Sequence, residues 1–168
     1  MRGVWVIAIA ALAGCGNGVS VSSDVKLENA TAHLMTSGTC PTAGGALAPC
    51  ASYQLTFALQ NDAQKAIDRV EDVQLSTGGA PLQNGSAIGC AGSPWTLPPG
   101  GASGVVDVVV SFGPEASLSV ECNDDSVARA TAALVSAPSA PGDSFDVKIE
   151  GLLSDAQPFM ATAHAPIF

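Results

Sequence analysis

Tyr53-Gln54-Leu55-Thr56-Phe57-Ala58-Leu59-Gln60 is the stretch that decides the fold. Large apolar side chains occupy its odd positions, and small or polar side chains occupy the even ones. Because successive side chains of a strand point to opposite faces, this alternation predicts a strand with one buried face and one solvated face. Asn61-Asp62 follows as a turn signal that ends the strand.

The same period of two recurs along the chain. It is clear in residues 105–112 and 145–150, and a shorter run occupies 118–122. Weaker strand candidates are residues 19–27, 67–76, 127–135 and 159–167. In the second of these, the early apolar residues are out of phase with the later ones, which predicts a bulge near Arg69. A helix competes with a strand at residues 127–135, because that segment is rich in alanine.

Gly- and Pro-rich connections separate these runs. They cover residues 36–49, 78–85, 94–104 and 137–142. Seven or eight short strands joined by such turns are typical of two antiparallel sheets packed face to face. The sequence therefore predicts an all-β chain, folded as an antiparallel β-sandwich with Greek-key connections.

Two segments resemble those of bacterial Ig-like surface domains. One is Trp95-Thr96-Leu97-Pro98-Pro99-Gly100-Gly101 with the valine-rich strand after it, and the other is residues 53–62. The resemblance implies an Ig-like β-sandwich of about seven to eight strands. The spacing of cysteine and tryptophan found in antibody domains is absent, because Trp95 follows Cys90 too closely.

The N-terminus carries a lipobox, Leu12-Ala13-Gly14-Cys15, after a basic start and an apolar run at residues 4–12. That run is too short to span a bilayer. These residues resemble the signal peptides of bacterial lipoproteins. The resemblance implies removal of residues 1–14, a diacylglycerol on the thiol of Cys15 and acylation of its new amine. An ordinary secretory signal peptide is the alternative.

The lipoprotein resemblance also implies an address. In the Gram-negative sorting rule an Asp after the lipidated cysteine favours the inner membrane, and Gly16 stands there instead. We therefore expect an outer-membrane protein, held to the membrane by its lipid on the periplasmic face or at the cell surface. Residues 15–23 are expected to form the lipidated cysteine and a short polar tether, and residues 24–168 a single sandwich domain.

The charge is strongly acidic. The 168-residue chain has a formal net charge of −9, and loss of Arg2 with the signal leaves five basic residues against fifteen acidic ones, or −10. Such a surface is a poor partner for nucleic acid or anionic headgroups. The acidic residues are dispersed, which is typical of a solvated surface and not of an acidic tail.

Four cysteines remain once Cys15 is set aside, namely Cys40, Cys50, Cys90 and Cys122. An even number in an exported protein predicts two disulfides. Three connectivities are possible, and the local choice pairs Cys40 with Cys50 and leaves Cys90 for Cys122. A zinc site is the competing interpretation, but the chain has no C-x-x-C pair.

Motifs for catalysis are weak. The serine in residues 100–104 lacks the G-x-S-x-G pattern of a nucleophile elbow and fits a turn before a strand. Glu121, Asp124 and Asp125 are close in sequence, but a glycosidase also needs aromatic platforms, and only Trp95 and Tyr53 are candidates. Calcium at residues 123–125 or 143–146 is conceivable, although no EF-hand loop is present. We expect no enzyme and no cofactor.

The two histidines give the sharpest chemical alternative. Each has a methionine at strand-compatible spacing, in the pairs His33 with Met35 and Met160 with His164. If the first and last strands were neighbours, these four side chains could form a copper(I) site, and the chain would be a periplasmic copper-handling protein.

The favoured interpretation is a non-catalytic interaction or accessory module of an outer-membrane assembly for secretion, adhesion or motility. Its partners would be other envelope proteins. We expect contacts through the connections at residues 36–49 and 94–104 or through an exposed sheet edge.

Overall fold

The computed structural model describes residues 20–82, 88–114, 117–123, 126–131 and 143–168, with the side chains of residues 121–131 outside the description. The lipobox therefore lies outside the described residues. In the described part of the chain, no helix has the length and apolar character needed to cross a membrane.

The described residues form two antiparallel sheets. The first has the strand order β1-β2-β5-β6-β7, and the second has the order β4-β3-β8-β9. The strands are β1 (Val25–Pro41), β2 (Leu47–Asn61), β3 (Ile67–Thr77), β4 (Ala80–Pro81), β5 (Ala102–Phe112), β6 (Ser117–Asn123), β7 (Ser126–Thr131), β8 (Ser144–Leu153) and β9 (Pro158–Pro166). The chain passes from one sheet to the other after β2, β4 and β7.

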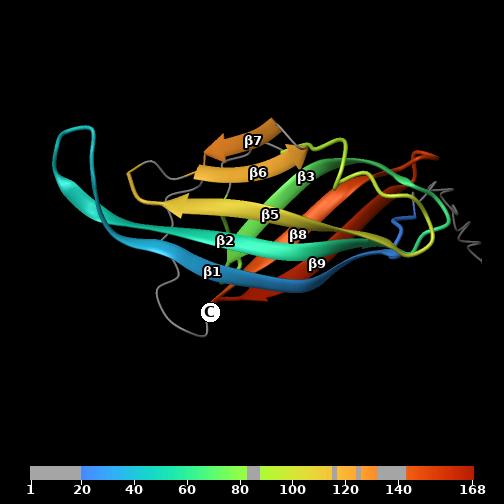
Figure 1. Ribbon diagram of the computed structural model, residues 1–168, viewed down its shortest axis with the longest axis horizontal. Helices are drawn as coiled ribbons and strands as arrows, with labels where there is room; N and C mark the ends of the chain where they lie inside the picture. Colours follow the sequence, from blue (N-terminus) through green and yellow to red (C-terminus); the bar gives the residue numbers. More distant parts are fainter. Residues whose placement is uncertain (1–19, 83–87, 115–116, 124–125, 132–142) are drawn as a thin grey trace, which may run out of the picture.

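The two sheets form an elongated sandwich (Figure 1). The odd-numbered residues of β2 from Tyr53 to Asn61 are buried, as their alternation predicts, and their apolar side chains share one core with those of β8 such as Val147 and Ile149. The opposite face of β2 is polar, where Thr56 Oγ1 donates to Asp107 Oδ1 of β5 at 2.6 Å. The all-β, antiparallel sandwich is therefore confirmed, while its Ig-like subtype stays a prediction.

Irregularities in β3 fall where the sequence places them. The pairing of β3 with β8 shifts register between Ile67 and Arg69 and again between Val70 and Asp72. The shifts bring Ile67, Val70, Val73 and Leu75 all into the core, although Val70 is out of phase with the other three in an ideal strand. The predicted bulge near Arg69 is confirmed.

The N-terminal part of the chain differs from the expectation. Ser22, expected in the tether, is buried, and its N–H donates to the Pro158 carbonyl at 2.8 Å. The strand expected at residues 19–27 instead begins at Val25 and continues for 17 residues. The connection expected at residues 36–49 is wrong, because strands occupy most of it and only residues 42–46 form a turn.

Asn61 fixes the end of the sandwich where β2 stops. Its side chain is fully buried, and its amide nitrogen lies 2.9 Å from the Lys65 carbonyl oxygen and 3.0 Å from that of Pro98. Its side-chain oxygen accepts the N–H of Ala63 at 3.1 Å. One amide therefore joins the β2–β3 turn to the loop that carries Trp95.

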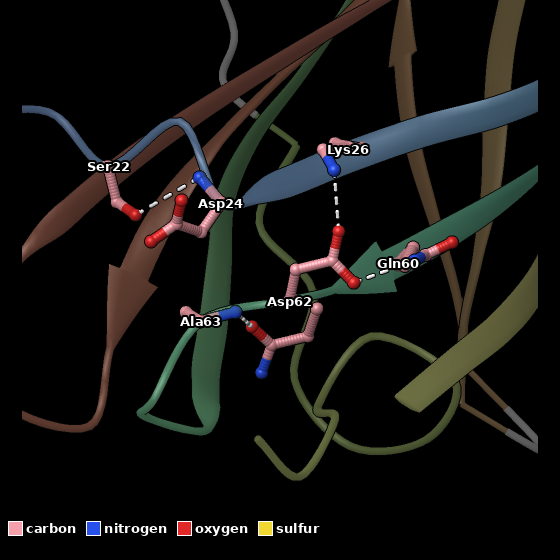
Figure 2. A network of polar contacts seen from close by, with 7 residues as sticks. Ser22, Asp24, Lys26, Gln60, Asp62 and Ala63 are labelled. Carbon is pink, nitrogen blue, oxygen red and sulfur yellow. Dashed lines mark hydrogen bonds and ion pairs between the residues drawn. The ribbon is translucent and has the colours of Figure 1, made fainter. Parts of the chain in front are cut away.

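An ion pair lies on the outside of the same end. Figure 2 shows Lys26 of β1 pointing at Asp62, with Gln60 on the other oxygen of the carboxylate; the two contacts are 2.6 and 2.7 Å. The hydrogen bond from Lys26 lowers the pKa of Asp62, and the same bond raises the pKa of Lys26. Both shifts favour the charged forms, as expected for opposite charges in contact.

Candidate functional site

The most distinctive feature of the molecule is a β-hairpin that extends beyond the rest of the sandwich. We call residues 36–50 the arm. β2 pairs with β5 only from Ala51 onward, so in the described part of the chain the arm is a two-stranded ribbon without further strands of its sheet beside it. Figure 1 shows it protruding at the end of the molecule opposite to the blue segment that leads into β1.

The tip of the arm is a tight turn. The Thr42 N–H donates to the Ala46 carbonyl at 2.7 Å, and the Gly45 N–H donates to the Thr42 carbonyl at 2.9 Å. Gly45 has a φ of 78°, the left-handed conformation that a three-residue hairpin loop requires at this position. The turn therefore sets the register of both strands of the arm.

A disulfide staples the arm. Cys40 and Cys50 are bonded, with Cα atoms 5.8 Å apart, and they join β1 to β2 four residues or fewer from the turn. An isolated two-stranded ribbon is only marginally stable in water. The disulfide therefore supplies stability that the arm does not gain from a hydrophobic core. The Cys40–Cys50 pairing expected from the sequence is confirmed.

The arm is uncharged and its apolar side chains are exposed. No Asp, Glu, Lys or Arg occurs from residue 29 to residue 61, although the chain carries 21 such residues. Leu47 is 69% exposed, and just before the arm Met35 is 54% and Leu34 is 45% exposed. Exposed apolar groups gathered in an uncharged segment are typical of a binding surface.

A hollow of about 480 Å³ lies at the base of the arm. Hydroxyl groups and apolar side chains line it together; the lining residues are Thr36, Cys40, Pro41, Cys50, Ala51, Ser52, Ser111, Phe112, Pro114 and Ser117. Behind it, Gly113 lies so close to the arm that a Cβ there would be 2.7 Å from the Cβ of Cys50. The main chain at Gly113 therefore packs directly against Pro49 and Cys50 of the arm.

The outer edge of β1 is covered over only part of its length. One parallel bridge joins Ser22, which precedes β1, to Phe159 of β9, and a second joins Ala32 of β1 to Ile167, which follows β9. The Phe168 N–H also donates to the Ala32 carbonyl at 2.9 Å. Within the described ranges, no strand pairs with this edge beyond Ala32, so the arm presents free main-chain groups there.

The second predicted disulfide is described only in part. Cys90 is buried, is disulfide-bonded and forms an antiparallel bridge with Val70. The side chain of Cys122 lies outside the described residues, so its pairing with Cys90 stays a prediction.

The four candidate copper ligands do not come together. β1 and β9 are neighbours, as that hypothesis requires. Met160 lies beside the Ser22 end of β1, however, whereas His33 and Met35 follow Ala32 near the middle of that strand, about 30 Å away at roughly 3.3 Å per residue. His164 Nδ1 contacts Asp146 Oδ1 at 2.9 Å on the surface. Among the described residues, no cluster of three His, Cys, Asp or Glu side chains could hold a metal.

The structure also places several other residues that the sequence suggests as sites. Tyr53 and Trp95 are both buried, so neither offers a platform for a sugar ring. The glycines at 100 and 101 form a turn before β5, as predicted, and the Gly101 N–H donates to the Asn61 carbonyl at 2.7 Å. Asp124 and Asp125, and the side chain of Glu121, lie outside the described residues, as do residues 137–142.

The arm was not recognisable from periodicity, but one signal pointed to it. Gly44-Gly45 lies midway between Cys40 and Cys50. Paired cysteines on either side of a central glycine turn fit a stapled hairpin as well as they fit an irregular loop.

Comparison of the chain with protein-family models, with curated proteins and with solved structures found no match.

Proposed function

We propose that this chain is a lipid-anchored protein of the bacterial envelope that binds another protein through its arm and does not catalyse a reaction. The observation that carries the proposal is the arm itself: a stapled, uncharged ribbon that extends past the sandwich with exposed apolar groups and a free strand edge. Such an edge can accept a strand of a partner by main-chain hydrogen bonding.

The position of the arm supports this role. β1 has 17 residues, which at about 3.3 Å each span roughly 55 Å from Val25 to the tip. Cys15 precedes residue 20 by five residues, so a lipid on Cys15 would hold that end near the membrane. The arm then projects away from the membrane surface, where a partner can reach it.

The lipid anchor is tested by labelling. In cells grown with radioactive palmitate, we expect the wild-type chain to incorporate label and Cys15→Ser to incorporate none, because the thiol is the acceptor. Gly16→Asp is the matched control: it should keep the label and move from the outer-membrane to the inner-membrane fraction. Equal labelling of wild type and Cys15→Ser would show that Cys15 is not lipidated.

The binding role is tested in intact cells with a photo-crosslinking amino acid at Leu47, which is 69% exposed on the arm. We expect irradiation to give a covalent adduct with another protein chain. The same amino acid at Thr162, an exposed residue of β9 remote from the tip, should give none. Equal adducts at both positions, or none at Leu47, would contradict the proposed role of the arm.

A further inference from the structure

The main chain of the arm has a defined pattern of free hydrogen-bonding groups. The Thr42 N–H bonds to Ala46, and further along the ladder Cys40 lies opposite Ala48 and Gly38 opposite Cys50. In an antiparallel pair, residues that exchange hydrogen bonds alternate with residues that do not. Gly38 and Cys40 therefore bond to β2, while the N–H and C=O groups of Ser37 and Thr39 point outward from the edge.

We propose that this edge pairs with the same edge of a second copy of the chain. Antiparallel pairing about a twofold axis at Gly38 places Ser37 of each copy opposite Thr39 of the other. Each of these two residue pairs exchanges two main-chain hydrogen bonds, so the outward groups of one copy satisfy those of the other. This inference rests on the proposed role of the arm as the binding surface.

The residue at the axis fits this arrangement. Pairs that do not exchange hydrogen bonds approach most closely, with Cα atoms about 4.5 Å apart. Gly38 would lie opposite its own copy at such a position, and a Cβ added to it would meet no atom within 4 Å in a single chain. Pro41 has no N–H, which stops the ladder from growing toward the tip. The pairing is therefore short and closed.

Charge restricts a contact between two copies to the arm. Each chain carries a net charge of −9, so two copies repel one another through their bodies. The arm carries no charged residue and extends beyond the sandwich, so two arms can overlap while the acidic bodies stay apart (Figure 1).

The geometry also determines how two copies face one another. In an antiparallel pair the two bodies lie at opposite ends of the joined arms. From Val25 to the axis at Gly38 is roughly 43 Å, at about 3.3 Å per residue, so the two Val25 residues lie about 85 Å apart. Copies anchored near residue 20 then project from two facing membranes and meet tip to tip. Many weak pairs acting together supply the avidity.

The test uses the full lipidated chain in two vesicle populations of neutral phosphatidylcholine, one of which carries an epitope-tagged copy. A photo-crosslinking amino acid at Thr39 should give an adduct of tagged with untagged chain after mixing, and the vesicles should cluster. Ser37→Pro removes an outward N–H without removing a bond to β2, and we expect it to reduce adduct and clustering about tenfold or more. Ser37→Ala retains the N–H and should behave as wild type.

Recovery of Ser37→Pro with its Cys40–Cys50 disulfide intact and with the Tm of the wild type shows that the staple and the sandwich have formed. A pair of charge variants tests whether any loss of clustering comes from disturbed pairing and not from a damaged arm. Ser37→Glu should abolish clustering, because like charges then meet near the axis. Mixing Ser37→Glu vesicles with Ser37→Lys vesicles should restore clustering, because the charges then have opposite signs. Adducts confined to one vesicle population would overturn pairing across membranes. No two-copy adduct, alongside a Leu47 adduct with a different protein in cells, would overturn self-pairing and leave the proposed function standing.

Discussion

Replacing Asn61 with Ala is expected to lower the free energy of unfolding by about 3–5 kcal/mol, because each buried polar group left without a partner costs about 1–3 kcal/mol. The side chain is fully buried, and its amide serves the carbonyls of Lys65 and Pro98 and the N–H of Ala63. Alanine would leave all three unsatisfied. Urea denaturation followed by the fluorescence of Trp95, which is buried in the adjoining loop, measures the change.

Gln60→Ala is the matched control for Asn61→Ala. Gln60 precedes Asn61 in β2, but its side chain makes a surface contact with Asp62, and we expect its removal to change the unfolding free energy by less than about 0.5 kcal/mol. A loss below about 1 kcal/mol for Asn61→Ala would mean that water replaces the amide and that the loop does not depend on it.

Gly151→Ala is expected to cost about 3 kcal/mol or more, at the upper end for an overpacked core. Gly151 lies in β8 under the bulge of β3, where an added Cβ would overlap the Arg69 carbonyl oxygen and come within 2.7 Å of the Phe159 ring. The carbonyl belongs to a hydrogen-bonded strand and cannot move aside cheaply. Thermal unfolding by circular dichroism would show the loss as a lower Tm.

Gly38→Ala controls for the intrinsic difference between glycine and alanine in a strand. Gly38 also lies in a strand, but nothing is within 4 Å of an added Cβ. We expect unchanged or slightly raised stability, by up to about 1 kcal/mol, because alanine restricts the unfolded chain. If both substitutions had the same effect on Tm, close packing at Gly151 would not be the cause.

The strands with one buried face could be predicted from the sequence, because burial of one face requires apolar residues at every second position. Residues 53–60 and 145–150 show this, and both lie in core strands as expected. The bulge in residues 67–76 could also be predicted, because the spacing of the apolar residues changes there. The bulge keeps Val73 and Leu75 in the core.

The arm could not be predicted in the same way, for a physical reason. Residues 36–50 have no buried face, so no selection for alternating apolar residues acts on them, and Thr, Ser, Gly and Pro give the segment the composition of a loop. Main-chain pairing, the Gly45 turn and the Cys40–Cys50 bond hold it instead. The free edge depends on where β9 ends beside β1, which is a tertiary relation that the sequence does not display.

The path of β1 has a mechanical consequence. This strand runs from the region next to residue 20 to the tip of the arm, and it is paired with β2 along nearly its whole length. Its cross-strand bonds are perpendicular to its direction. A tension applied between the two ends of the molecule is carried by the covalent main chain of β1, which is already extended, and none of these hydrogen bonds has to break. The staple between Cys40 and Cys50 shares this load with β2 near the tip.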